Sequence, residues 1–225
     1  MSKVFASYEE VLAASERFAT GLGHLVLPRG SRVLVGMEQR WESVAFVWAC
    51  LGTGLVPVPV SAHLKEYELT SIREDIDPAF EVPGWAEMQQ LLASTRSTFE
   101  RTPPCRPIHL TSGTTGRPKG VWSGFWSADH ASAALKEESE LWGFTAADTN
   151  LVISPLYHSA PLRFALNTVI AGGGLVVPER FDMDLIRAAI DSSRPTTMFC
   201  VPTHLKRFIT AHDAGTGFDF SSFRL

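Results

Sequence analysis

Short apolar segments that favour β-strands alternate with helical segments along this 225-residue chain, and this alternation is what most limits its fold. Residues 32–36 are expected to form a strand, residues 42–51 an apolar helix and residues 55–60 a second strand, which together make one βαβ unit. The same alternation returns after residue 106. Strands that alternate with helices predict an α/β fold with mainly parallel sheets, flanking helices and right-handed crossovers.

Local signals predict where the first elements begin and end. Ser7-Tyr8-Glu9-Glu10 has the form of a capping box, so a first helix is expected over residues 8–22. Residues 62–93 are expected to be helical, with a break at Asp77-Pro78 because the residue before a proline disfavours helical geometry.

A change in composition predicts a subdomain boundary. Residues 94–104 are rich in Ser, Thr, Arg and Pro, which is typical of an exposed connection. We therefore expect a first α/β subdomain over residues 1–105 and a second over residues 106–225. The second is expected to contain strands at 108–111, 121–122, 150–154, 175–177 and 197–201, and helices at 127–142, 162–171 and 182–191.

One short loop, HLTSGTTGRPKG from His109 to Gly120, carries the strongest chemical signal. Glycines let backbone N–H groups turn toward an anion, hydroxyls add donors, and a lysine adds positive charge. The expected phosphate-binding residues are Thr111, Ser112, Gly113, Thr114, Thr115, Gly116 and Lys119. The glycine spacing excludes a Walker A loop, and Ser112 does not fit the Gly-x-Ser-x-Gly pattern of a hydrolase nucleophile.

This loop resembles the phosphate-binding signature of the AMP-forming ligase superfamily, which includes acyl-CoA synthetases, luciferases and peptide-synthetase adenylation domains. A second family pattern, Leu-x-x-Gly-x-x-x-Val-Pro-Val, matches Leu51, Gly54 and residues 58–60. The resemblance covers essentially the whole chain. It implies the N-terminal part of the large domain of such a ligase, most like a fatty-acid or aryl-acid CoA ligase.

The resemblance also implies a reaction and its cofactors. In the family the loop holds the β- and γ-phosphates of ATP, with Mg²⁺, while a carboxylate attacks the α-phosphorus and pyrophosphate leaves. The acyl adenylate then reacts with CoA to form a thioester. Amides, hydroxyls and the Lys119 ammonium suit this role, because they stabilise the charge that develops on the leaving pyrophosphate. ATP, Mg²⁺ and CoA are thus the expected small-molecule partners, and no residue is assigned as a metal ligand.

A second candidate site follows a predicted strand, at the end where α/β sheets bind ligands. Residues 154–161, SPLYHSAP, resemble the Pro-Leu-x-His segment of acyl-CoA and aryl-CoA ligases. The resemblance implies that His158 contacts the acyl group or acyl adenylate and that Tyr157 lines the pocket. Peptide-synthetase adenylation domains carry an aspartate here that pairs with the substrate ammonium group. This segment has none, which favours a simple carboxylic acid over an amino acid.

Two downstream segments carry weaker signals. CoA ligases often have a basic residue before a phenylalanine, and Arg180 precedes Phe181, so Arg180 is a candidate contact for a CoA phosphate. Residues 201–204, VPTH, resemble a family segment that lines the acyl pocket. His204 either lines that pocket or simply begins a helix.

The resemblance leaves part of the family's machinery unmatched. The adenine-binding and ribose-binding segments, the glutamate that helps hold magnesium, and the C-terminal domain with its catalytic lysine have no counterpart in this chain, so its catalytic residue is unknown. We expect an N-terminal fragment of an acyl-CoA synthetase that is a poor catalyst alone. The alternatives are a noncatalytic nucleotide- or acyl-binding module, a fragment that a separately encoded C-terminal half completes, or an adenylation domain for an amino or aryl acid.

Composition narrows the partners and compartment. The net charge is −4 and the sequence pI about 6.0, which gives no electrostatic footprint for nucleic acid. Cys50, Cys105 and Cys200 are few and far apart, which favours free thiols in a reducing cytoplasm. The N-terminus lacks the basic-then-apolar order of a signal peptide. The longest uncharged run, residues 43–63, is broken by Gly and Pro, so no membrane span is expected. An incomplete sheet would expose apolar surface, so self-association is expected, although the oligomeric state stays open.

Overall fold

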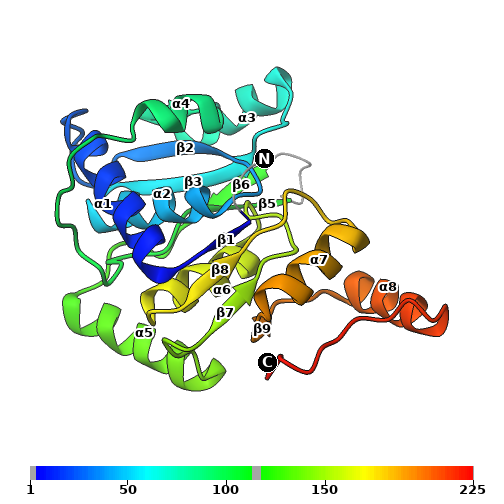
Figure 1. The fold of residues 1–225 in the computed structure, drawn as a ribbon. Helices are drawn as coiled ribbons and strands as arrows, with labels where there is room; N and C mark the ends of the chain where they lie inside the picture. Colours follow the sequence, from blue (N-terminus) through cyan, green and yellow to red (C-terminus); the bar gives the residue numbers. More distant parts are fainter. Residues whose placement is uncertain (1–3, 113–117, 225) are drawn as a thin grey trace.

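The computed structural model describes residues 4–112 and 118–224, which form two larger sheets with helices between and outside them and a separate two-stranded hairpin (Figure 1). The first sheet contains β2 (Arg32–Met37), β3 (Val56–Ser61) and β4 (Phe80–Val82), in the order β3-β2-β4 with all neighbours parallel. The central strand β2 is buried along Val33–Met37. A strand covered on both faces needs apolar residues at consecutive positions, which explains its sequence RVLVGM.

The second sheet has four strands in the order β1-β8-β7-β9. Its members are β1 (Phe5–Ala6), β7 (Thr149–Leu151), β8 (Gly174–Val176) and β9 (Thr197–Met198). Strands β7, β8 and β9 run parallel, whereas β1 pairs antiparallel with β8 and places Ala6 opposite Leu175. The predicted α/β fold with mainly parallel sheets is confirmed. The N-terminal strand thus joins the sheet of the second half, and the proposed boundary near residue 105 stays a prediction.

Helices α1 (Tyr8–Gly23), α2 (Trp41–Gly52) and α6 (Ser159–Ile170) form the layer between the two sheets (Figure 1). Phe18 of α1 meets Phe46 of α2 edge to face, with ring centroids 5.2 Å apart. Burying such side chains is the main stabilising term of the fold.

The outer faces of the two sheets are covered by other helices. Beyond the first sheet lie α3 (Glu66–Ile76) and α4 (Trp85–Gln90) (Figure 1). Beyond the second lie α7 (Met183–Ser193) and α8 (Pro202–Asp213), which enclose a smaller apolar cluster. The layers therefore alternate between helix and sheet. No helix in the described part of the chain is long and apolar enough to span a membrane.

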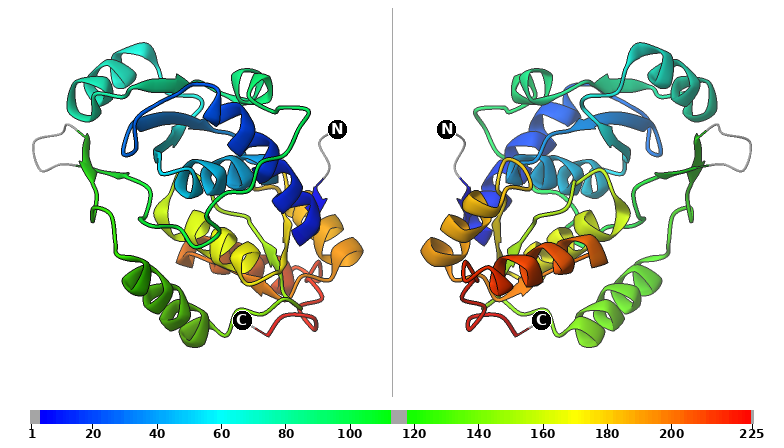
Figure 2. Two further views of the ribbon diagram at one scale, coloured as in Figure 1. Left: turned by 90° about the vertical axis from the view of Figure 1, so that its left-hand side faces the viewer. Right: turned by 90° about the vertical axis from the view of Figure 1, so that its right-hand side faces the viewer.

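A two-stranded hairpin and one further helix flank this body. The hairpin consists of β5 (His109–Ser112) and β6 (Pro118–Val121), and it stands at one edge of the molecule (Figure 2). Two hydrogen bonds anchor it: the Ile108 amide donates to the Pro57 carbonyl at 3.0 Å, and the Gly120 amide donates to Asp75 at 2.9 Å. Helix α5 (Ala128–Trp142) packs beside α6.

In the first half of the chain one local prediction is confirmed and another needs correction. The capping box is confirmed, since the Ser7 amide donates to Glu10 at 3.0 Å and the Glu10 amide donates to the Ser7 hydroxyl at 3.4 Å. The segment 62–93 is not helical throughout, because it contains β4. Asp77 ends α3 in the left-handed conformation at φ 48°, and the chain then turns back to pair with β2.

Two strands of the second half, β7 and β9, are shorter than predicted. The strand predicted over residues 150–154 ends at Leu151, and the one predicted over residues 197–201 ends at Met198. Pairing sets these limits, because a strand ends where its neighbour no longer supplies hydrogen bonds.

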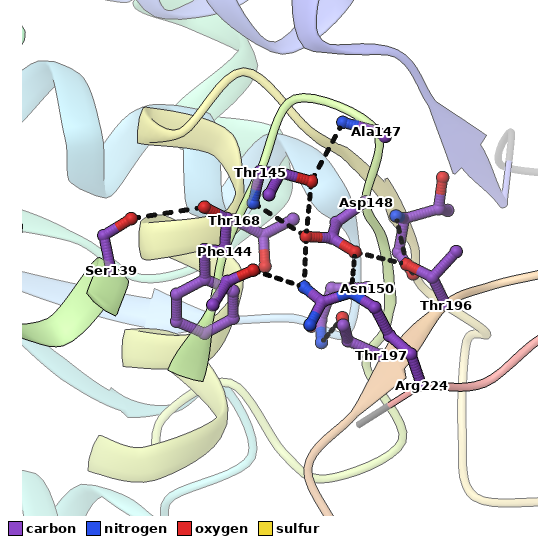
Figure 3. A network of polar contacts seen from close by, with 12 residues as sticks. Ser139, Phe144, Thr145, Ala147, Asp148, Asn150, Thr168, Thr196, Thr197 and Arg224 are labelled. Atoms are coloured by element: carbon purple, nitrogen blue, oxygen red, sulfur yellow. Dashed lines mark hydrogen bonds and ion pairs between the residues drawn. The ribbon is translucent and has the colours of Figure 1, made fainter. Parts of the chain in front are cut away.

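A buried carboxylate joins the ends of the second sheet (Figure 3). Asp148 is 3% exposed; it accepts hydrogen bonds from the Thr145 amide at 2.7 Å, the Thr196 hydroxyl at 2.8 Å and Arg224 Nε at 2.8 Å. Burial acts to raise the pKa of Asp148, but the bonds from Arg224, Thr196 and Thr145 outweigh it and hold the pKa below its ordinary value. This network ties the starts of β7 and β9 to residue 224.

Candidate functional site

A cavity of about 800 Å³ lies where strands of both sheets end. Its lining residues end β2 and β3, follow β2, β3, β7 and β8, or belong to the first two turns of α8. They are Met37, Glu38, Gln39, Arg40, Ser61, His63, Ile153, Pro155, Tyr157, Glu179, Arg180, Phe181, Thr203, His204 and Arg207. The carboxyl ends of parallel strands are where α/β folds place ligands, so this cavity is the principal candidate site.

The cavity brings together three residues singled out in the sequence: Tyr157, Arg180 and His204. His204 lies in the first turn of α8 and also lines the cavity, and its role in an acyl pocket stays a prediction. His158 is exposed at the N-cap of α6, and its ring centroid is 4.4 Å from that of Tyr157. The segment predicted to contact the acid therefore borders the cavity.

An aromatic platform forms one side of this cavity. The His204 ring stacks on Phe181 with centroids 4.5 Å apart, and the Arg207 guanidinium carbon lies 4.9 Å from the same Phe181 ring centroid. Burial, and then the charge of Arg207, hold the pKa of His204 below its ordinary value. His204 is thus neutral near pH 7, and Arg207 supplies the positive charge. Sequence reasoning missed Arg207; its only signal is its helical spacing from His204.

Gln39, which was also missed, connects the two sheets beside the cavity. Its Nε2 donates to the carbonyls of Val152 at 3.0 Å and Ser154 at 3.1 Å, and its Oε1 accepts from the Leu156 amide at 3.2 Å. One side chain at the end of β2 thus fixes the backbone that leads to Tyr157. A lone glutamine after a strand gives no sequence signal for this role.

Replacing Gln39 by alanine is expected to cost about 2 kcal/mol of unfolding free energy, because two carbonyls and one amide lose their partner. Chemical denaturation measures this cost, and hydrogen exchange at the Leu156 amide should accelerate. Gln89→Ala on the exposed face of α4 is the control and should leave both quantities unchanged. Equal behaviour of the two variants would contradict the role given to Gln39.

The predicted phosphate loop lies on the β5–β6 hairpin rather than among the residues that line the large cavity. Thr111 stands opposite Lys119, and its hydroxyl donates to the Lys119 carbonyl at 3.3 Å. The Lys119 side chain is exposed and forms no ion pair with any residue that the structure describes. Ser112 ends β5, and the predicted residues Gly113, Thr114, Thr115 and Gly116 lie outside the described residues.

The hairpin residues fit an anionic ligand. An exposed lysine without a carboxylate partner keeps its charge available for an anion. Within residues 4–112 and 118–224, no three His, Cys, Asp or Glu side chains gather in a way that would hold a metal ion.

Comparison with known proteins identifies a family and relatives that match most of this chain. The model of the AMP-binding enzyme family matches residues 2–102 and 105–225. A feruloyl-CoA synthase from Amycolatopsis sp is 28% identical over 97% of this chain and 48% of its own length. A 2-succinylbenzoate–CoA ligase from Bacillus subtilis is 27% identical over 88% of this chain and 44% of its own. The chain thus spans about half the length of these relatives.

Solved structures share the fold. ATP-bound MatB from Rhodopseudomonas palustris superposes with a TM-score of 0.78 at 24% identity, over 97% of this chain and 48% of that one. The o-succinylbenzoate CoA synthetase MenE from Bacillus subtilis, in complex with AMP, superposes with a TM-score of 0.73 at 25% identity, over 90% and 57%. Since the family model matches nearly the whole chain, the chain belongs to the family of AMP-binding enzymes.

Proposed function

We propose that this chain supplies the phosphate-binding hairpin and the acid- and CoA-binding surfaces of an AMP-forming ligase that converts a carboxylic acid to its CoA thioester. The observation that carries the proposal is an exposed Lys119, opposite Thr111, on a hairpin whose motif is that of the AMP-binding enzyme family. The curated relatives support the class, since their names are those of CoA synthases and CoA ligases.

The proposed chemistry has two steps. A carboxylate oxygen of the acid attacks the α-phosphorus of ATP, the bond to the β-phosphate bridge breaks, and pyrophosphate leaves with the negative charge. The CoA thiolate then attacks the carbonyl carbon of the acyl adenylate, and AMP leaves. In this proposal the exposed Lys119 ammonium, opposite Thr111 on the hairpin, stabilises the charge on the leaving pyrophosphate. A magnesium ion bound with ATP would supply further positive charge there.

The acid is proposed to be a simple carboxylic acid. Tyr157 lines the large cavity and the His158 ring lies 4.4 Å from the Tyr157 ring, and the carbonyl of the acid is proposed to react beside these two residues. Residues 154–161 contain no carboxylate to pair with an ammonium group, and a buried ammonium without a partner is strongly unfavourable.

The relatives are about twice as long as this chain, and we propose that groups outside it complete the adenylation site. Turnover by the 225 residues alone is then expected to be slow. When catalytic groups act together, removing some of them costs most of the rate enhancement that the whole set provides. Cys50, Cys105 and Cys200 are free thiols, which supports a proposed location in the reducing cytoplasm.

Incubation with ATP, Mg²⁺, CoA and a mixture of short, medium, long and aromatic acids tests the proposed reaction. Mass spectrometry should detect acyl adenylates without CoA and acyl-CoA with it. Binding of ATP without either product, after prolonged incubation at high protein concentration, would favour a noncatalytic nucleotide-binding module instead.

Arg180 and Arg207 are proposed to bind a phosphate group of CoA at the large cavity. Arg180 has a side chain 67% exposed and only a 3.4 Å ion pair with Asp182, and Arg207 lies over Phe181. Each is placed to form charge-assisted hydrogen bonds to a phosphate, worth about 1.5–3 kcal/mol.

Substituting Arg180 or Arg207 by alanine is therefore expected to weaken CoA binding by about tenfold and to leave MgATP binding unchanged. Isothermal titration calorimetry measures both affinities. Arg96→Ala, which removes an exposed arginine far from the cavity lining, is the matched control. Unchanged CoA affinity in both cavity variants would remove these residues from the proposed site.

A further inference from the structure

The last turn of α3 contacts the hairpin that carries Lys119. Helix α3 packs against β6, and Asp75 near its end accepts a hydrogen bond from the Gly120 amide at 2.9 Å. The two residues are 45 positions apart in the sequence, so the fold brings them together. A backbone amide that donates to a carboxylate forms a charge-assisted hydrogen bond, which is stronger than a bond between two neutral groups.

The peptide group between Lys119 and Gly120 is held at both of its polar ends. Its N–H donates to Asp75 at 2.9 Å, and its carbonyl accepts from the Thr111 hydroxyl at 3.3 Å. A peptide group is planar, and its plane includes the Cα atom of the residue before it, here Lys119. Two partners on different sides of this group therefore fix the direction in which the Lys119 side chain leaves the hairpin.

Gly120 allows α3 to approach the hairpin this closely. A Cβ atom at residue 120 would lie 2.5 Å from Ile76 Cδ1 and 3.0 Å from Ile108 Cγ2. Nonbonded carbon atoms pack best at about 3.5–4.0 Å, so a side chain here would push β6 away from α3. The bond to Asp75 would then lengthen or break. The contact itself thus requires glycine at this position.

The end of α3 is fixed to the first sheet without help from the hairpin. Ile76 is 3% exposed, and its carbonyl accepts a hydrogen bond from Arg32 of β2. Arg73 donates to both carboxylate oxygens of Glu81 on β4, at 2.7 Å and 2.9 Å. A bidentate pair of this kind restricts orientation as well as distance. Asp75 is therefore presented to the hairpin from a firm support.

Helix α3 gains nothing from a carboxylate at Asp75. The C-terminal end of a helix carries partial negative charge, which repels a carboxylate in the last turn. Asp75 is exposed, and it forms no ion pair with the residues that the structure describes. Its contact with the Gly120 amide is thus the interaction that gives this side chain a role.

We propose that Asp75 is a positioning residue of the hairpin, which holds the Lys119–Gly120 peptide so that the Lys119 ammonium meets the leaving pyrophosphate. The inference rests on the proposed function and adds to it a residue outside the phosphate-loop motif. In this role Asp75 touches no substrate atom and acts through Lys119. Removing Asp75 should therefore slow the reaction only while Lys119 is present.

A double-mutant cycle between Asp75 and Lys119 tests the proposal, with acid-dependent pyrophosphate release in a single turnover as the readout. Asp75→Ala should slow release by about tenfold, because a misdirected ammonium stabilises the transition state less well. Its Kd for MgATP should change by less than about twofold, since the positive charge remains. In the Lys119→Ala background the same substitution should slow release no further.

Two further variants separate the hydrogen bond from the charge. Asp75→Asn keeps an oxygen acceptor and should release pyrophosphate within about twofold of the wild-type rate. Asp191→Ala removes an exposed carboxylate from the last turn of α7, and it should behave as the wild type does. Hydrogen exchange at the Gly120 amide reports the bond without catalysis, and it should accelerate in Asp75→Ala alone. Melting temperatures should stay within about 4 °C of the wild type, because Ile76 and Arg73 hold α3.

The outcomes separate this inference from the proposed function. Asp75→Ala that releases pyrophosphate at the wild-type rate, or that slows release equally with and without Lys119, overturns the positioning role and leaves the ligase standing. Failure of Asp75→Asn to restore the rate overturns it as well. A wild-type chain that releases no pyrophosphate with any acid overturns both, whereas slowing that depends on Lys119 and is rescued by asparagine supports both.

Discussion

Replacing Asp148 by alanine is expected to lower the free energy of unfolding by about 3 kcal/mol, because it leaves buried donors and a guanidinium without their acceptor. Thr145, Thr196 and Arg224 all donate to this carboxylate, and they come from three separate parts of the chain (Figure 3). The second sheet should therefore lose its connection between β7, β9 and the segment that ends at residue 224. Denaturant unfolding measures the loss.

Asp191→Ala provides the control for this variant, because Asp191 is exposed near the end of α7 and should change stability by less than about 0.5 kcal/mol. A loss at Asp148 no larger than at Asp191 would show that the network contributes little.

The same network predicts an acid-sensitive step in stability. The pKa of Asp148 is lower in the folded chain than its ordinary value, so the unfolded chain binds the proton more readily. The stabilisation is complete above the ordinary pKa, near pH 4, and is lost as the pH falls through the lower, folded pKa. Unfolding free energies measured between pH 2 and about 6 should show this step in the wild type and a smaller step in Asp148→Ala.

Replacing Lys119 by alanine is expected to slow acid-dependent pyrophosphate release by about 100-fold, in line with the removal of one group that stabilises transition-state charge. Lys119 is exposed on β6 and forms no ion pair with the described residues, so its removal should not unfold the hairpin. Single-turnover assays with the chain in excess over labelled ATP measure the rate even where turnover is slow.

Lys136→Ala is the matched control for the lysine variant. Lys136 is an exposed residue of α5 that forms only a 3.7 Å pair with Glu140 one turn away. Both variants remove one positive charge and should have the melting temperature of the wild type. If they slow the release equally, the effect is one of net charge and the role given to Lys119 is wrong.

The elements with strong local signals were predictable from the sequence. The capping box at Ser7 predicted the start of α1, and the apolar run that follows Arg32 predicted the strand β2. Short elements were not predictable, because the two residues of β1 and the three of β4 become strands only through partners distant in the chain. Their residues carry no periodicity of their own.

Some residues of the candidate site could likewise be predicted from the sequence, and others could not. Motif residues such as Lys119 and Tyr157 could be named in advance, since the chemistry of a phosphate loop and the family segment constrain residue type. Gln39 and Arg207 could not, because their roles depend on which backbone or ring the fold places beside them. Placement of this kind is decided by tertiary packing rather than by local sequence.

The claim that the β5–β6 hairpin binds the phosphates of ATP is tested most directly by calorimetric titration of the chain with MgATP. The account predicts saturable binding by the wild type and by Lys136→Ala, and at least about tenfold weaker binding by Lys119→Ala. Absence of binding by the wild type, or equal affinity in all three proteins, would contradict it.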